Sequence, residues 1–276
     1  MDTRKENLFI MNHNLTEDTK ICRYMGFDVF LQLLYGKLYV PRRMKFLDVR
    51  ESGQVPLRNY FALRAVGETH VKPLTDVNAE QKRINSLIAN LKKSRFLLTS
   101  CWTIDNGEDY LMWKSYATQI GVCVKTTIGQ LLSNINYEKF NLLPICSTMS
   151  YLSIYQKAGF LESVFAKDKH YQSENEFRIY FVPRDNTTEE EMKSIDTEIV
   201  ERILSKSSEK EEEQSENPNY QTSIFLDIDP QFINSIVLSP FIKSSTIDCF
   251  QDIIYRQFSH VLQKNVSIDK SRITEE

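Results

Sequence analysis

The sequence predicts a single α+β domain with a mixed, largely antiparallel sheet and helices packed against it. Three observations support this fold class. Hydrophobic residues make up 41% and aromatic residues 11% of the 276 residues, which is enough for a folded core. Short apolar or β-branched runs recur between amphipathic stretches of helical period. These runs do not alternate strictly with the helices, as they would in a doubly wound parallel sheet.

Charge and cysteine content exclude several classes of protein. Lys plus Arg total 34 and Asp plus Glu 37, a net charge of -3, which excludes a strongly basic nucleic-acid binder but not a local basic groove. The five cysteines are odd in number and contain no CxxC pair, which argues against a disulfide framework and a zinc knuckle. No signal peptide is visible, and no run of about 18 apolar residues exists to span a bilayer. We therefore expect a cytoplasmic protein without a membrane partner.

The N-terminal part predicts a polar arm followed by a strand, a helix and a second strand. Residues 1–20 are polar and indicate a flexible arm. Gly26 interrupts the first strand. Gly36 is placed to end the helix, because glycine readily takes the left-handed conformation found at helix ends. The three elements are a strand at 21–25, a helix at 27–35 and a strand at 37–40.

The rest of the chain predicts short strands among helices of moderate length. Residues 121–127 alternate and are β-branched, which favours a strand, while apolar residues recur on one face of a helix at 78–95. Residues 189–205 are expected to form a charged helix, and the acidic run after them to be mobile. The stretch 187–219 is then a charged, partly disordered insertion within a single domain over 21–276. The remaining predicted strands are 96–102, 145–151, 176–182, 222–228, 235–239 and 265–268, and the remaining helices 108–116, 128–135 and 245–262.

The sharpest chemical pattern is an acidic and basic triplet that leads into the strand at 176–182. On a strand, Glu174, Glu176 and Arg178 share one face, because successive side chains alternate. Two carboxylates about 7 Å apart beside a guanidinium can take separate chemical roles. One can hold a substrate hydroxyl while the other orients a nucleophile. The alternative is a solvated strand face with an internal ion pair of little energetic weight.

An aromatic pair precedes the strand at 121–127. Trp113 and Tyr116 are three residues apart, so they share one face of a helix and either anchor it in the core or stack on a flat ring. Lys125 and Thr126 are placed to reach a phosphate or a ribose hydroxyl. The four histidines are scattered without a ligand spacing, so we expect no metal site.

Arg23 interrupts an otherwise apolar strand and is followed by Tyr24. A buried, unpaired arginine costs several kcal/mol, so Arg23 must face solvent or meet an anion. The candidate anions are Glu174, Glu176 and a ligand phosphate.

Taken together, these motifs resemble a large, mostly uncharacterised "domain of unknown function" family of bacterial and phage proteins. The resemblance runs from Ile21 to Ile273, and the charged stretch at 187–219 is longer than usual. At Leu47-Asp48-Val49 the sequence departs from the Asp-Pro-Phe-Glu run of many members. Such families often sit among mobile elements and defence loci, which implies a toxin or antiviral effector. The matching motifs are Arg23-Tyr24-Met25, Gly36-Lys-Leu-Tyr-Val40, Cys101-Trp102, Met112-Trp113 with Tyr116, Gly121-Val122, Glu174 with Glu176 and Arg178, and Val237-Leu-Ser-Pro240.

More distantly, the sequence is similar to the ADP-ribosyltransferase arrangement. The resemblance implies an enzyme that consumes NAD as a substrate and modifies a protein or nucleic-acid acceptor. By this resemblance Arg23 holds the NAD phosphates or ribose, and Thr126 or Thr127 braces the site. Glu176 stabilises an oxocarbenium-like transition state and Glu174 orients the acceptor. The cofactor-binding residues expected on this basis are Arg23, Tyr24, Trp113, Tyr116, Thr126 and Arg178.

Two other functions remain open at this point. The first is a non-catalytic module that binds a nucleotide or RNA through the same basic and aromatic residues. The second is a nuclease that holds a magnesium ion through Glu174, Glu176 and an aspartate, although no supporting D…ExK spacing is present.

Overall fold

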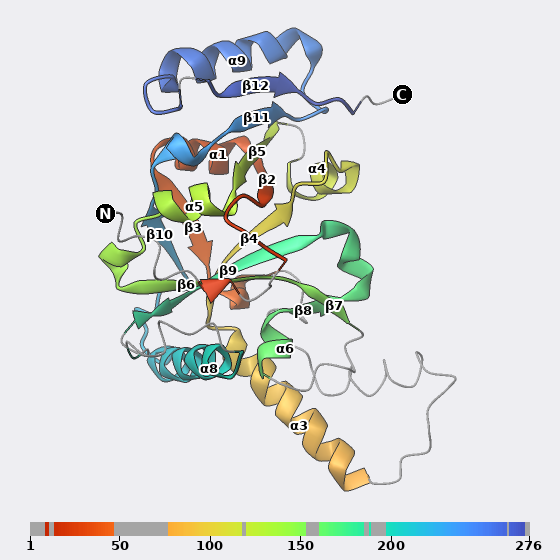
Figure 1. Cartoon of the computed structure of the whole chain (residues 1–276), viewed down its shortest axis with the longest axis vertical. Coiled ribbons are helices and arrows are strands. Elements are labelled where there is room, and N and C mark those ends of the chain that lie inside the picture. Colours follow the sequence, from red (N-terminus) through yellow and green to blue (C-terminus); the bar gives the residue numbers. More distant parts are fainter. Residues whose placement is uncertain are drawn as a thin grey trace.

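An eight-stranded, mostly antiparallel sheet organises the chain (Figure 1). The computed structural model describes residues 9–10, 14–46, 77–117, 120–152, 160–184, 188, 197–263 and 265–273. Two pairs of neighbours in the large sheet, β1 with β6 and β11 with β12, are parallel, and the other neighbours are antiparallel. The predicted α+β domain with a mixed, largely antiparallel sheet is therefore confirmed.

The strands and helices have the following bounds. Across the large sheet the strands are β1 (Phe9–Ile10), β6 (Leu142–Thr148), β9 (Glu176–Pro183), β4 (Leu98–Ile104), β2 (Lys20–Gly26), β5 (Gly121–Thr127), β11 (Ser235–Leu238) and β12 (Ser267–Lys270). Two smaller sheets pair β3 (Lys37–Pro41) with β10 (Ser223–Asp227), and β7 (Ser150–Leu152) with β8 (Ala166–Asp168). The α-helices are α1 (Phe27–Leu34), α3 (Val77–Ser94), α4 (Tyr110–Tyr116), α5 (Ile128–Asn134), α6 (Phe160–Val164), α8 (Thr197–Gln214) and α9 (Ser244–Phe258), and the 3₁₀ helices are η2 (Arg43–Lys45), η3 (Glu138–Phe140), η5 (Lys169–Glu174) and η7 (Pro230–Phe232).

The middle of the large sheet is split between β2 and β4. These strands pair at two positions, Ile21 with Ile104 and Cys22 with Thr103. By contrast, β2 pairs with β5 along its whole length. Beyond Cys22 the backbones of β2 and β4 are therefore no longer paired, and the sheet opens there.

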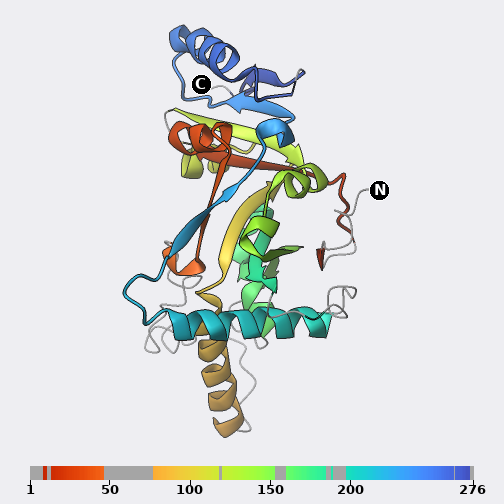
Figure 2. The same ribbon diagram turned by 90° about the vertical axis from the view of Figure 1, so that its left-hand side faces the viewer.

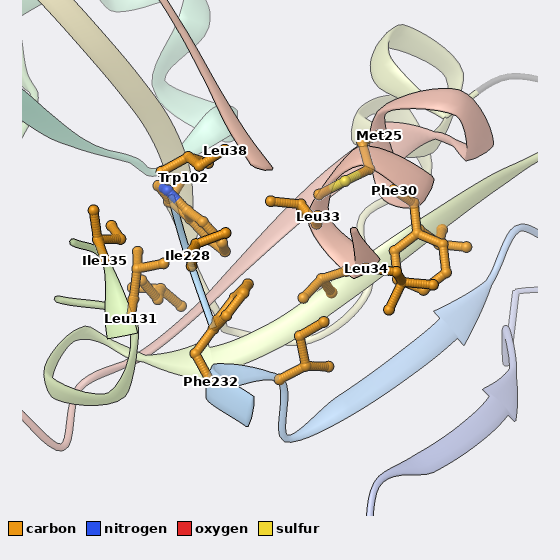
Figure 3. Close-up of a cluster of buried hydrophobic side chains, with 14 of the residues drawn as sticks. Met25, Phe30, Leu33, Leu34, Leu38, Trp102, Leu131, Ile135, Ile228 and Phe232 are labelled. Atoms are coloured by element: carbon orange, nitrogen blue, oxygen red, sulfur yellow. The ribbon is translucent and has the colours of Figure 1, made fainter. Parts of the chain in front are cut away.

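The main hydrophobic core covers one face of the sheet. Helices α1, α5 and α9 and the β3–β10 pair contribute buried side chains to it. Figure 3 shows part of this cluster, in which Phe30 and Leu33 of α1 and Leu131 of α5 gather with Trp102 of β4 and Phe232 of η7. Trp102 and Phe232 meet edge to face, with ring centroids 6.1 Å apart.

The opposite face carries two smaller clusters. Helices α6 and α8 bury side chains such as Val200 and Ile203 against β6 and β9. Helix α4 buries Met112 and Trp113 against β2, β5 and β11. Figure 2 shows α8 running across one end of the molecule with α3 projecting beyond it, while α9 and β12 lie at the other end. Between the two clusters, β4 and β9 present polar side chains on this face, and these residues supply the acidic part of the candidate site. Arg23 of β2 instead shares a strand face with Ile21 and Met25 of the main core and reaches the site through the split.

Most predicted elements appear within a few residues of their expected bounds. The strand at 121–127 matches β5, and Gly36 ends α1 with a φ of 73°, the left-handed conformation expected there. The strand expected at 145–151 is instead divided into β6 and β7. The division follows from hydrogen bonding, because the Met149 N–H donates to Glu176 O and Ser150 leaves the large sheet to pair with Ala166 of β8.

The charged insertion is partly helical, with different bounds from those expected. Helix α8 ends at Gln214, so the first part of the acidic run continues the helix that was expected to end at 205. Arg42 of the loop before η2 holds this extension through an ion pair of 2.8 Å with Glu211 and a π contact with Tyr220. Residues 189–196, most of the arm before residue 14, and the departure at 47–49 lie outside the described residues.

Candidate functional site

A pocket of about 480 Å³ lies at the split between β2 and β4. Its polar lining holds four cationic side chains and two carboxylates, so its formal charge is positive. We call it the split pocket. Its lining residues are Arg23, Tyr24, Met25, Gly26, Val29, Pro41, Lys45, Phe46, Thr99, Cys101, Trp102, Thr103, Met112, Tyr116, Lys167, Glu174, Glu176 and Arg178. Six of the eight predicted site residues are therefore brought together.

Glu176 and Arg178 form a buried ion pair on one face of β9, as their spacing predicted. Arg178 Nε lies 2.5 Å from Glu176 Oε1, and Arg178 Nη2 lies 3.0 Å from Glu176 Oε2. The Arg178 side chain is 1% exposed and the Glu176 side chain is 6% exposed. Cys101 and Thr103 of β4 lie directly opposite these two residues in the β4–β9 register. The pair is therefore anchored in the middle of the sheet while it faces the pocket.

Glu174 reaches the site by a different route from the predicted one. It is the last residue of η5 and not a strand residue, and Asn175 follows it with a φ of 42°. The turn at Asn175 breaks the strand alternation that was expected to place Glu174 beside Glu176. Instead, Lys167 Nζ joins the two carboxylates, 2.6 Å from Glu174 Oε2 and 3.1 Å from Glu176 Oε2.

Two tyrosines complete the surroundings of the acidic pair. The Tyr116 hydroxyl of α4 donates to Glu174 Oε1 over 3.4 Å, and burial together with the charge of Glu174 raises the pKa of this phenol. The Tyr151 hydroxyl of β7 accepts a hydrogen bond of 2.6 Å from the Glu176 N–H. Burial raises the pKa of Tyr151 to about 12. Both phenols are thus neutral at physiological pH.

Arg23, like Lys45, is a cation of the split pocket without a carboxylate partner among the described residues. Its guanidinium lies 5.8 Å from the Trp102 ring centroid and makes no hydrogen bond or ion pair with any residue that the structure describes. Burial lowers the pKa of Arg23, while the nearby Cys101 acts in the opposite direction. Such a group gains free energy when an anion enters the pocket.

Tyr24 lines the pocket and at the same time anchors α4. Its hydroxyl accepts a hydrogen bond of 3.0 Å from the Asp109 N–H at the start of α4. Its ring meets Trp113 edge to face, with centroids 4.8 Å apart. Tyr24 therefore fixes the position of the helix that carries Tyr116.

Two expected cofactor-binding residues do not line the split pocket. Trp113 is fully buried behind Tyr24 and donates its indole N–H to Glu108 over 3.2 Å. Thr126 donates a hydrogen bond of 2.6 Å to Phe232 O inside the core. Side chains alternate along β5, and Val124 belongs to the main core, so Thr126 points into the same core. Its neighbour Thr127 accepts from Gln130 N and caps α5.

Lys167 and Tyr151 are site residues that the sequence prediction missed. The two lie beside each other in the β7–β8 register. Lys167 follows the apolar run Val164-Phe165-Ala166, so a lysine at the end of a buried segment is the signal that the sequence offers. Nothing in their spacing links them to Glu176, because the contact depends on how η5 returns the chain to the sheet.

Other features of the described residues bear on possible ligands. In the described part of the chain, no group of three or more His, Cys, Asp or Glu side chains is arranged to hold a metal ion. None of the described helices has the length and apolarity that crossing a membrane requires. Comparison of the chain with protein-family models, with curated proteins and with solved structures found no match.

Proposed function

We propose that this chain is an NAD-consuming, ADP-ribosyltransferase-like enzyme that modifies a protein or nucleic-acid acceptor. One observation carries the proposal. Arg23, which has no ion-pair partner among the described residues, lines the same pocket as Glu174 and Glu176. A cation for phosphate and a carboxylate pair for the ribose are therefore available to one ligand.

The composition of the split pocket suits a dinucleotide. Arg23 and Lys45 provide positive charge for a pyrophosphate, in addition to the cations that neutralise the glutamates. Phe46 and Tyr116 offer aromatic surface for flat rings. A volume of about 480 Å³ falls within the range of roughly 300–1,000 Å³ that is usual for ligand pockets.

The proposed reaction requires the carboxylates to stabilise a cation and to accept a proton. The bond between the ribose carbon and the nicotinamide nitrogen breaks, and nicotinamide leaves with the bonding electron pair. Positive charge develops on the ribose, and a fixed carboxylate stabilises it more in the transition state than in the ground state. The acceptor oxygen or nitrogen then bonds to the ribose carbon and releases its proton to a carboxylate.

The two glutamates differ in a way that suggests separate roles. Glu176 is 6% exposed and fixed by Arg178, so it is the carboxylate that stabilises the ribose cation. Glu174 is 17% exposed and contacts Tyr116 at the edge of the pocket, so it is the carboxylate that meets the acceptor and takes its proton.

The decisive experiment incubates the protein with NAD labelled in both its nicotinamide and its adenosine. Free nicotinamide and a labelled macromolecule are the expected products. Glu176→Gln is expected to abolish nicotinamide release and to retain NAD binding by calorimetry, and Glu174→Gln to lower macromolecular labelling more than release. Glu209→Gln, on the exposed pair with Lys93, is the matched control and should retain both. Thermal unfolding checks that each variant is folded. A folded wild-type protein that releases no nicotinamide with any acceptor contradicts the proposal.

A non-catalytic nucleotide-binding module is the second candidate. It is favoured by the contacts of Glu176 with both Arg178 and Lys167, which already engage this carboxylate without a ligand. Such a module binds NAD or another nucleotide, and neither added acceptor nor added divalent metal produces turnover.

A further inference from the structure

Lys167 is a buried lysine whose ammonium is shared by the two glutamates of the split pocket. Its side chain is 8% exposed. Nζ lies 2.6 Å from Glu174 and 3.1 Å from Glu176, and it also sits 4.8 Å from the centre of the Tyr171 ring. Buried lysines are rare unless paired, because removing an ammonium from water is costly. The contacts with two carboxylates offset that cost.

Charge balance explains why both carboxylates can be accommodated here. Glu174 and Glu176 bring two negative charges into the interior, and Arg178 and Lys167 bring two positive charges. Arg178 contacts Glu176, whereas Lys167 contacts both glutamates. Among the described residues, the link between the two carboxylates therefore runs through Lys167.

We propose that Lys167 is a positioning residue that holds Glu174 and Glu176 together and ionised for their separate roles in ADP-ribosyl transfer. This inference rests on the proposed function. Lys167 itself touches no reacting atom in this scheme. It keeps the acceptor-facing carboxylate beside the ribose-facing one, although the turn at Asn175 takes Glu174 out of the β9 strand.

Among the described residues, the other groups that face this cluster do not replace the charge of Lys167. Tyr116 of α4, Tyr151 of β7 and Tyr171 of η5 are phenols, and Cys101 lies across from Arg178 on β4. Arg178 of β9 makes two contacts with Glu176 and a third, of 3.4 Å, with the Tyr180 hydroxyl. When the lysine charge is removed, the cluster carries an excess negative charge, and one glutamate takes up a proton at a higher pH than before.

The first arm of the test is the pH profile of nicotinamide release. Lys167→Met is expected to lower the rate at pH 7.5 on the order of 10- to 100-fold. It should also move the acid limb of the profile upward by about one pH unit. Lys167→Arg keeps the charge and should restore the position of the acid limb. Lys93→Met removes a lysine from the exposed pair with Glu209 and should change neither quantity.

The second arm needs no activity and so separates this inference from the proposed function. The unfolding midpoint of Lys167→Met is compared with that of the wild type at pH 8 and at pH 5. Protonation of one glutamate relieves the excess charge, so the deficit of the variant should shrink as the pH falls. An equal deficit at both pH values, with an unmoved acid limb, overturns the positioning role. A wild type without nicotinamide release but with the pH-dependent deficit refutes the transferase and leaves Lys167 as the charge that holds the two glutamates together.

Discussion

Arg178 and Glu176 sit two residues apart on β9 and make two nitrogen–oxygen contacts, of 2.5 and 3.0 Å. The guanidinium is also covered by the Phe46 ring, 5.3 Å from its centroid. Both side chains are nearly inaccessible, yet they line the split pocket. This pair is thus at once part of the sheet interior and the floor of the candidate site, so its loss should affect stability as well as function.

Replacing Arg178 with methionine is expected to destabilise the fold by about 3–5 kcal/mol, because among the described residues it leaves the buried Glu176 with Lys167 as its remaining cation. Urea denaturation measures the loss. The double variant Arg178→Met with Glu176→Met should recover much of it, since apolar residues can replace a buried pair at little cost. Arg256→Ala, which removes an exposed pair with Asp252, is the control and should leave the midpoint unchanged. A fully stable Arg178→Met variant contradicts this account of the pair.

Replacement of Arg23, unlike that of Arg178, is not expected to destabilise the fold. Arg23 has no ion pair among the described residues, and burial lowers its pKa, so its charge is a cost to the folded state. Arg23→Met is therefore expected to unfold at the wild-type temperature or above it, and to bind NAD at least about tenfold more weakly. Differential scanning calorimetry and titration calorimetry measure the two effects. Lys37→Met, on the exposed pair with Asp227, serves as the control for a lost cation and should leave NAD affinity unchanged. An unchanged NAD affinity in Arg23→Met contradicts a role for Arg23 in phosphate binding.

Thr126 is expected to contribute to stability and not to ligand binding. Thr126→Val keeps the shape of the side chain but leaves Phe232 O without its hydrogen bond in the core. The expected loss is about 1–3 kcal/mol of unfolding free energy, with NAD affinity unchanged. Chemical denaturation and titration calorimetry on the same preparation separate the two quantities. A Thr126→Val variant that folds normally but binds NAD poorly would show that Thr126 contributes to ligand binding.

Local patterns in the sequence were sufficient to predict much of the fold. The alternation of residues 121–127 and the glycine at 36 depend on neighbours along the chain, and both appear in the structure as expected. The same alternation also predicts that Thr126 lies in the core and not at the pocket. Thr126 lies on the side of Val122 and Val124, so the core was its predictable environment.

The candidate site depended more on contacts between distant segments. Arg23 and Glu176 were expected to share a cleft, and both line the split pocket, although Arg23 contacts Trp102 there and Glu176 contacts Arg178 and Lys167. The position of Glu174 was not expected, because the left-handed backbone conformation of Asn175 interrupts the alternation of the strand. Lys167 was missed because the β7–β8 pair and the η5 turn, and not sequence spacing, bring it to Glu176.

The β3–β10 pair predicts a pH dependence of stability remote from the pocket. Lys139 and Lys37, which approach Asp227 to 2.5 and 2.6 Å, lower the pKa of Asp227 to about 2. The ordinary value is about 3.9, so the folded state binds this proton less readily than the unfolded chain. The stabilisation is therefore complete above about pH 4 and disappears as the pH falls toward 2. Asp227→Asn should unfold earlier than the wild type at pH 6 and at the same point near pH 2. Because all three side chains are accessible to solvent, 1 M salt should shrink the difference at pH 6. A difference that persists at low pH would assign the effect to hydrogen bonding and not to charge.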